Sequence, residues 1–136
     1  MRTRIWFLLV VVVAAGCGSS GPFEYTPVNG TVEYEDGSLL PGSEIRLVFV
    51  PQDVAAVGGA HPRMARAIVN AQGVFDCVTS YKYGDGLIPG THKVVFQVAV
   101  SQDGKSIVPT AYTNVDATPL VIDTADAPLV IKVPKP

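Results

Sequence analysis

His92-Lys93-Val94-Val95-Phe96-Gln97-Val98-Ala99-Val100 is the stretch of this sequence that decides the fold. It has the two-residue period of a β-strand with one apolar face, and that face is made of Val94, Phe96, Val98 and Val100. Pro89-Gly90 fixes the entry to the stretch, and the polar residues from Ser101 to Lys105 form a turn after it. We therefore expect this to be the strongest strand of a β-domain, with His92 on its polar, solvated side.

Shorter runs of the same kind occur on both sides, separated by glycine, proline and turn pairs such as Asp36-Gly37. In the run from Glu44 to Val50, alternate residues starting at Ile45 are apolar and are expected to face inward. No convincing helix is found. Seven strands are predicted, and they are Val28 to Tyr34, Glu44 to Val50, Arg63 to Val69, Val74 to Thr79, His92 to Val100, Pro119 to Ile122 and Leu129 to Val133. Their rhythm is typical of an all-β sandwich.

The first sixteen residues have the layout of a secretory signal. Met1-Arg2-Thr3-Arg4 is basic, and Ile5 to Gly16 carries no charge. These twelve uncharged residues make about 18 Å of helix, well short of the roughly 30 Å hydrocarbon core of a bilayer. The sequence therefore favours a cleaved signal over a spanning helix.

A run of small residues ends directly before a cysteine. Ala14-Ala15-Gly16-Cys17 resembles the lipobox of bacterial lipoproteins, although Ala14 stands where leucine or valine is commoner. The resemblance implies that residues 1–16 are a lipoprotein signal peptide and that the Cys17 thiol carries a diacylglyceryl group, with further acylation of the new amino terminus. An ordinary secretory signal with a coincidental cysteine is the alternative.

The lipobox implies a permanent membrane anchor, because two or three acyl chains hold a protein on a bilayer almost indefinitely. Gly18-Ser19-Ser20-Gly21-Pro22 is typical of a flexible linker. We therefore predict residues 17–27 as lipidated cysteine and tether, and residues 28–136 as one sandwich domain. The expected location is the cell envelope, on the exported side of a membrane, either periplasmic or surface-exposed.

Charge and cysteine content exclude some classes of partner. Without the leader, 120 residues remain, with eight basic and twelve acidic side chains and a net charge of about −4. That balance gives no reason to expect binding to nucleic acid. If Cys17 is lipidated, Cys77 has no partner for an intramolecular disulfide, and its strand-like surroundings predict a small apolar packing residue.

Several short motifs together carry a family resemblance. They are Val28-x-Gly30-x-Val32, Asp36-Gly37, Leu40-Pro41-Gly42, Phe49-x-Pro51, Gly73-x-Phe75, Asp85-Gly86-x-x-Pro89-Gly90-x-x-Lys93-Val94 and Val108-Pro109-x-x-Tyr112. In this order, the set resembles the small carboxypeptidase regulatory-like lipoproteins of planctomycete bacteria, over nearly the whole chain after the leader. The resemblance implies a transthyretin-like or Cna-B-like domain. We therefore expect a seven-stranded antiparallel β-sandwich of the Ig-like or transthyretin-like kind.

The sequence offers no pattern typical of catalysis, a cofactor or a metal. No Gly-x-Ser-x-Gly elbow is present, and the chain ends in Val133-Pro134-Lys135-Pro136 rather than in the Tyr-Arg-Gly-Ser type of motif of the transthyretin-like hydrolase. Asp85 and Asp103 lie in glycine-containing loops that lack the spaced acids of a calcium loop. His61 and His92 have no second ligand near them in sequence. We expect a protein that is not an enzyme.

The most turn-rich segment is Tyr81 to Gly90, with three glycines and a proline. We predict it as a contact loop that uses Tyr81, Tyr83, Asp85 and Leu87. The function favoured by the sequence is a non-catalytic structural or protein-interaction module that binds an envelope protein by loop docking or β-strand addition. The alternative is a carbohydrate-binding module for envelope polysaccharide. An accessory subunit of a transport or assembly complex is a third hypothesis.

Overall fold

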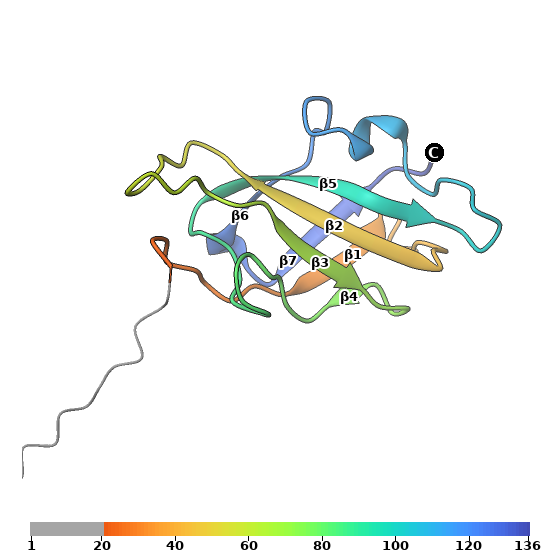
Figure 1. The fold of residues 1–136 in the computed structure, drawn as a ribbon. Coiled ribbons are helices and arrows are strands. Elements are labelled where there is room, and N and C mark those ends of the chain that lie inside the picture. The colour runs from red at the N-terminus through yellow and green to blue at the C-terminus, as the bar shows by residue number, and fades with distance from the viewer. Residues whose placement is uncertain (1–20) are drawn as a thin grey trace, which may run out of the picture.

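The computed structural model describes residues 21–136, in which seven strands form a two-layered β-sandwich (Figure 1). One sheet has the order β4 (Val74–Phe75), β1 (Gly30–Tyr34) and β7 (Leu129–Val133). The other has the order β3 (Ala65–Val69), β2 (Glu44–Pro51), β5 (Thr91–Val100) and β6 (Val121–Asp123). The predicted all-β sandwich is confirmed. The predicted signal peptide and Cys17 lie outside the described residues.

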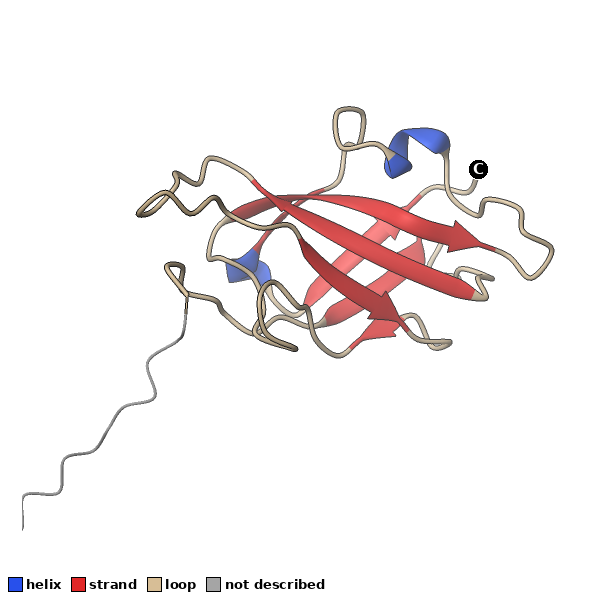
Figure 2. Cartoon of the chain, viewed as in Figure 1, coloured by secondary structure: helices blue, strands red, loops and turns tan. Residues whose placement is uncertain are grey.

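Helix is confined, in residues 21–136, to two short 3₁₀ turns, η1 (Thr110–Thr113) and η2 (Thr124–Asp126) (Figure 2). No helix of these residues is long and apolar enough to cross a membrane.

The core lies between the two sheets and is built from the inward positions of alternating strands. Ile45, Leu47 and Phe49 of β2 are all buried, as the sequence predicts. Phe49 meets Phe75 of the opposite sheet, with the ring centroids 6.0 Å apart and the rings tilted by 55°. Because a buried phenylalanine removes on the order of 150 to 250 Å² from water, this pair joins the two layers at their centre.

The sheets are not antiparallel throughout. The first and last strands, β1 and β7, pair in parallel, and Val32 lies opposite Ile131 in that register. The expectation of a uniformly antiparallel sandwich is therefore wrong for this pair. Parallel neighbours cannot be joined by a tight turn, so no local turn signal in the sequence marks their pairing.

Strand β5 contains a bulge that changes which residues it buries. Phe96 pairs with Leu47 whereas Val98 pairs with Arg46, so Gln97 has no partner on β2. One extra residue shifts the alternation by one position. Ala99 is consequently buried, and the prediction that Val98 and Val100 share the buried face of Val94 and Phe96 is wrong.

His92 is also buried, with 1% of its surface exposed, contrary to the predicted solvated position. It shares the parity of Val94 and Phe96, which places it on the inner face of β5. Its Nε2–H donates a hydrogen bond to the Ile88 carbonyl oxygen at 2.8 Å, and Nδ1 has no hydrogen-bond partner among the described residues. Burial lowers the pKa of His92.

The domain begins earlier than the sequence indicates. Phe23 is buried, and Thr26 exchanges two backbone hydrogen bonds with Leu87 at 2.8 and 2.9 Å. The predicted tether, residues 17–27, is therefore wrong in its second half, because an apolar anchor and a β-bridge fix that part to the sandwich. The chain enters the domain at the end of the sandwich where the loop between β2 and β3 also lies (Figure 1).

Candidate functional site

The segment from Ser80 to Gly86 is a tight loop organised by one carboxylate. Asp85 Oδ1 accepts the backbone N–H of Ser80 at 2.8 Å. Its Oδ2 accepts the backbone N–H groups of Tyr81 at 2.9 Å and Lys82 at 2.8 Å. Ser80 Oγ donates to the Gly86 carbonyl at 2.6 Å. Because three consecutive N–H groups converge on one side chain, Asp85 has an internal structural role in the contact loop and does not itself face a partner.

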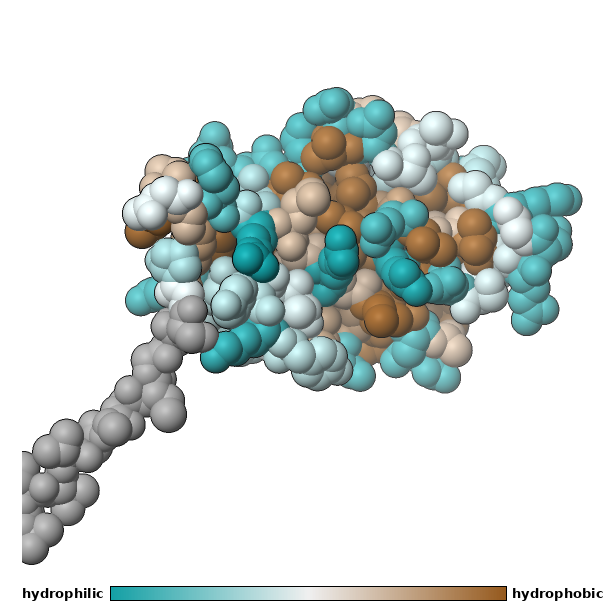
Figure 3. All heavy atoms as spheres, in the orientation of Figure 1, coloured by the Kyte–Doolittle hydropathy of each residue, from teal (hydrophilic) through white to brown (hydrophobic). Residues whose placement is uncertain are grey.

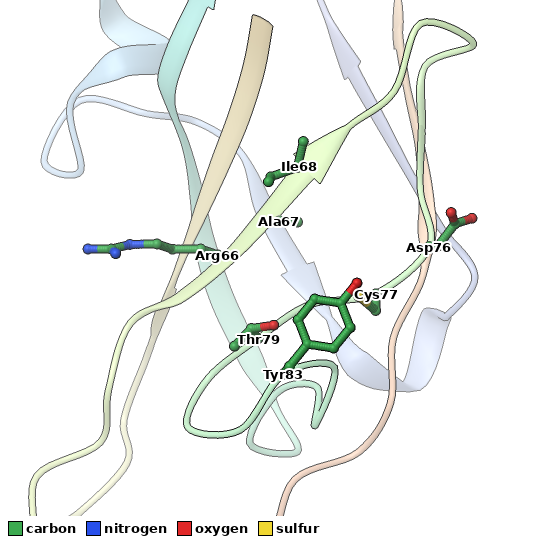
Figure 4. A pocket seen from close by; sticks show the side chains of 7 residues that line it. All are labelled: Arg66, Ala67, Ile68, Asp76, Cys77, Thr79 and Tyr83. Atoms are coloured by element: carbon green, nitrogen blue, oxygen red, sulfur yellow. The ribbon is translucent and has the colours of Figure 1, made fainter.

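The loop presents its two tyrosines differently. Tyr81 is half-exposed, and the Arg63 guanidinium lies 5.0 Å from its ring centroid in a cation–π contact. Tyr83 is 90% exposed and extends back along the edge of the sandwich, with its hydroxyl end toward Cys77 (Figure 4). The neighbouring Cys77 side chain raises the pKa of Tyr83. Tyr83 is thus the most accessible large side chain of the loop.

Leu87 does not belong to the exposed contact surface. It is fully buried, and its backbone pairs with Thr26 on the other side. The prediction of Leu87 as a contact residue is therefore wrong. Gly86, Leu87 and Ile88 are all buried, so the exposed contact loop ends before them.

The chain after β4 crosses from one sheet to the other and leaves a gap in the edge of β3. Residues 74–79 were predicted as one strand, but β4 ends at Phe75 and Thr79 already pairs with Arg66 of β3. Asn70, at the far end of β3, donates its N–H to the Val74 carbonyl at 2.8 Å. The β3–β4 hairpin therefore has backbone hydrogen bonds at both ends, at Arg66 and Asn70, and none in between.

Ile68 lies at the middle of this gap. Alternate residues of a strand direct their N–H and C=O groups to the same edge, so Ile68 shares the edge of Arg66 and Asn70. Arg66 exchanges two backbone hydrogen bonds with Thr79, each of 2.9 Å. Within residues 21–136, the Ile68 backbone has no hydrogen-bond partner on this edge, because the chain between Phe75 and Thr79 does not pair with β3.

This gap forms a pocket of about 290 Å³, here called the edge pocket (Figure 4). Its lining is more apolar than polar and consists of Arg66, Ala67, Ile68, Asp76, Cys77, Thr79 and Tyr83. The charged ends of Arg66 and Asp76 point away from its centre in opposite directions (Figure 4). The pocket thus combines an open backbone donor and acceptor, an apolar lining and one exposed aromatic ring.

The described residues hold no metal site and one further pocket of similar size. A second pocket of about 310 Å³ shares Asp76 and Cys77 with the edge pocket and is otherwise lined by Pro27, Val28, Asn29 and Gly84. In residues 21–136, no three His, Cys, Asp or Glu side chains lie close enough to hold a metal ion. Cys77 is a free, half-buried thiol.

Sequence reasoning identified the tyrosines of this site and missed its other half. Ile68 is 72% exposed although its strand is otherwise well packed. The sequence does hold a signal for Ile68. Arg66, Ile68 and Asn70 occupy successive outward positions along the predicted strand and directly after it, and an isoleucine between two polar residues there is unusual. Arg63 and Thr79 carry no such local signal, because the contact loop lies next to them only in the folded chain.

The edge pocket is interpreted from its geometry, because comparisons with known proteins give no match to guide the interpretation. No family model matches the chain, and neither a curated protein nor a solved structure does.

Proposed function

We propose that this protein is a bacterial envelope lipoprotein in which a non-catalytic β-sandwich serves as a protein-interaction module. Cys17 carries the lipid anchor, and the module acts on the exported side of a membrane. The anchor is supported by the basic, apolar and small-residue order that ends at Cys17.

We further assign the sandwich to the carboxypeptidase regulatory-like, transthyretin-like group rather than to an immunoglobulin-like one. In a constant-type immunoglobulin domain, the first two strands lie in the same sheet. Here β1 lies in the three-stranded sheet and β2 in the four-stranded one. That distribution differs from the constant-type immunoglobulin arrangement, and the ordered motifs of the sequence are what support the family.

The edge pocket is the observation that carries the proposed interaction. The unpaired N–H and C=O of Ile68 point to the same side, and one extended residue of a partner can pair with both through its own C=O and N–H. Because the rungs on both sides are already made by Arg66 and Asn70, a long strand cannot add along this edge. The site therefore suits a loop tip or chain end of an envelope protein, which inserts one extended residue and packs a side chain against Tyr83.

Two experiments test this proposal separately. Cys17→Ser should leave an unprocessed or soluble product in cell fractionation, and normal processing with unchanged membrane association would contradict the anchor. For the interaction, lipidated protein is cross-linked in intact cells and its attached chains are identified by mass spectrometry. Tyr83→Ala should remove the dominant partner, whereas Val130→Ala, a change at an exposed residue of the opposite sheet, should retain it.

A carbohydrate-binding module is the second candidate. The observation that favours it is the Tyr83 ring, which is 90% exposed and lines the edge pocket together with Thr79. Exposed aromatic rings offer flat apolar faces on which sugar rings stack. Retention of the protein on envelope polysaccharide, lost in Tyr83→Ala and kept in Tyr83→Trp, would replace the protein-interaction proposal with this one.

A further inference from the structure

Three segments far apart in sequence meet where the chain leaves the sandwich toward its amino terminus. A Cβ atom on Gly21 would lie 3.9 Å from the Tyr25 ring. Burial raises the pKa of Tyr25, and Asp85, Arg63 and Tyr81 are all near enough to act on that pKa. The Arg63 guanidinium is 5.0 Å from the Tyr81 ring centroid. We call the surface formed by Tyr25, Arg63, Met64 and Tyr81 the tether end.

The distance from this surface to the anchor is limited by chain length. Gly21 follows Cys17 by four residues, and a fully extended chain spans at most about 3.6 Å per residue. Gly21 therefore lies within about 14 Å of Cys17 whatever the conformation of the residues between them. A cysteine whose thiol carries a diacylglyceryl group is held at the membrane surface. The tether end is then held within reach of the bilayer.

The composition of the tether end suits contact with lipid headgroups. Tyr81 and Met64 are 49% and 59% exposed. Tyrosine combines an apolar ring with a polar tip and is enriched at the boundary between membrane and water. The Arg63 guanidinium, held over the Tyr81 ring, can donate two parallel hydrogen bonds to a phosphate. At this end of the molecule, polar and apolar side chains are mixed (Figure 3).

The charge of this region is also mixed, which determines how strongly it can bind. Lys82 on the contact loop is exposed, but so are Glu24 and Asp53 on the two neighbouring segments. Oppositely charged groups at similar positions give little net attraction to an anionic surface. The tether end alone should therefore not bind membranes, and the acyl chains must supply the affinity.

We propose that the tether end lies against the phospholipid headgroups and orients the whole domain, with Arg63 bound to lipid phosphate and Tyr81 and Met64 at the headgroup boundary. This inference rests on the proposed lipidation of Cys17. The strands run away from the tether end, and the eight residues of β2 alone extend roughly 25 Å. Leu39, in the turn before β2, is consequently carried away from the membrane, and the edge pocket lies on the flank between the two ends.

Single tryptophans can test this orientation, because the only tryptophan of the sequence, Trp6, lies in the predicted leader. Full-length Tyr81→Trp and Leu39→Trp variants are expressed in a bacterium that processes lipoproteins, purified in detergent and reconstituted into phosphatidylcholine vesicles. Both positions are about half-exposed, so the two reporters are matched in solvent access. Quenching by phosphatidylcholine with a nitroxide on its headgroup is measured, and mass spectrometry reads the lipid on Cys17.

Lipidated Tyr81→Trp should be quenched several-fold more than lipidated Leu39→Trp, and adding Arg63→Glu to Tyr81→Trp should reduce its quenching. Equal quenching of the two lipidated reporters would overturn the orientation and leave the lipoprotein proposal intact. Absence of lipid on a processed Cys17 would overturn both. Vesicle binding by the Cys17→Ser protein would contradict the inference that the anchor supplies the affinity.

Discussion

Replacement of Asp85 by alanine tests whether one carboxylate holds the contact loop. The change removes the acceptor of three backbone N–H groups, those of Ser80, Tyr81 and Lys82, at 2.8 to 2.9 Å. Hydrogen bonds to a charged group are worth about 1.5–3 kcal/mol when the donor cannot be rehydrated. Because Tyr81 and Lys82 are exposed and Ser80 is only half-buried, much of this is recovered by water. We expect Asp85→Ala to lower the free energy of unfolding by about 2–3 kcal/mol.

Urea denaturation of the mature domain measures this loss, with two control variants. Asp85→Asn keeps one acceptor oxygen and should lose about half as much. Asp116→Ala removes an exposed loop carboxylate that accepts no hydrogen bond from residues 21–136, and it should change stability by about 0.5 kcal/mol or less. A loss in Asp85→Ala no greater than that in Asp116→Ala would refute the role assigned to Asp85.

Three further changes probe other parts of the structure. Burial lowers the pKa of His92 below its ordinary value of 6.5, so the unfolded chain binds the proton more readily and stability falls as the pH drops below about 6.5; His92→Gln should flatten this part of the stability profile, and an unchanged profile would contradict it. Gly86→Ala would place a Cβ 1.8 Å from a carbonyl oxygen, whereas Gly90→Ala meets no atom within 4 Å although both residues have positive φ; thermal unfolding should therefore show at least about 2 kcal/mol more destabilisation in Gly86→Ala. Tyr83→Ala should speed alkylation of the half-buried Cys77 thiol by iodoacetamide several-fold, because the Tyr83 hydroxyl end lies toward that thiol. An unaltered rate would show that Tyr83 does not shield Cys77.

Local periodicity was sufficient to predict most of the strands. The range Leu129 to Val133 was predicted with the bounds that the structure gives to β7, and the inward residues of β2 are those expected from alternation. These segments were predictable because burial on one face of a strand imposes a two-residue period on the sequence.

The features that sequence reasoning missed depend on contacts between distant segments. The bulge at Gln97 is set by the register of β5 against β2, which no residue within β5 reveals. The crossing after Phe75 arises because Val74 and Phe75 pair with β1 while Thr79 pairs with β3. For the candidate site, Tyr81 and Tyr83 were predictable as exposed loop residues. The open rung at Ile68 was not, since it exists only where two sheets separate.

Photo-cross-linking in intact cells tests the central claim most directly, because it reports what touches the edge pocket. A benzophenone amino acid is placed at position 83 and, in a second strain, at position 130 on the opposite sheet, where the valine is 60% exposed. The proposed interaction predicts one dominant envelope protein attached at position 83 and absent at position 130. The same set of neighbours at both positions, with no enriched chain, would contradict a partner-binding role for the edge pocket.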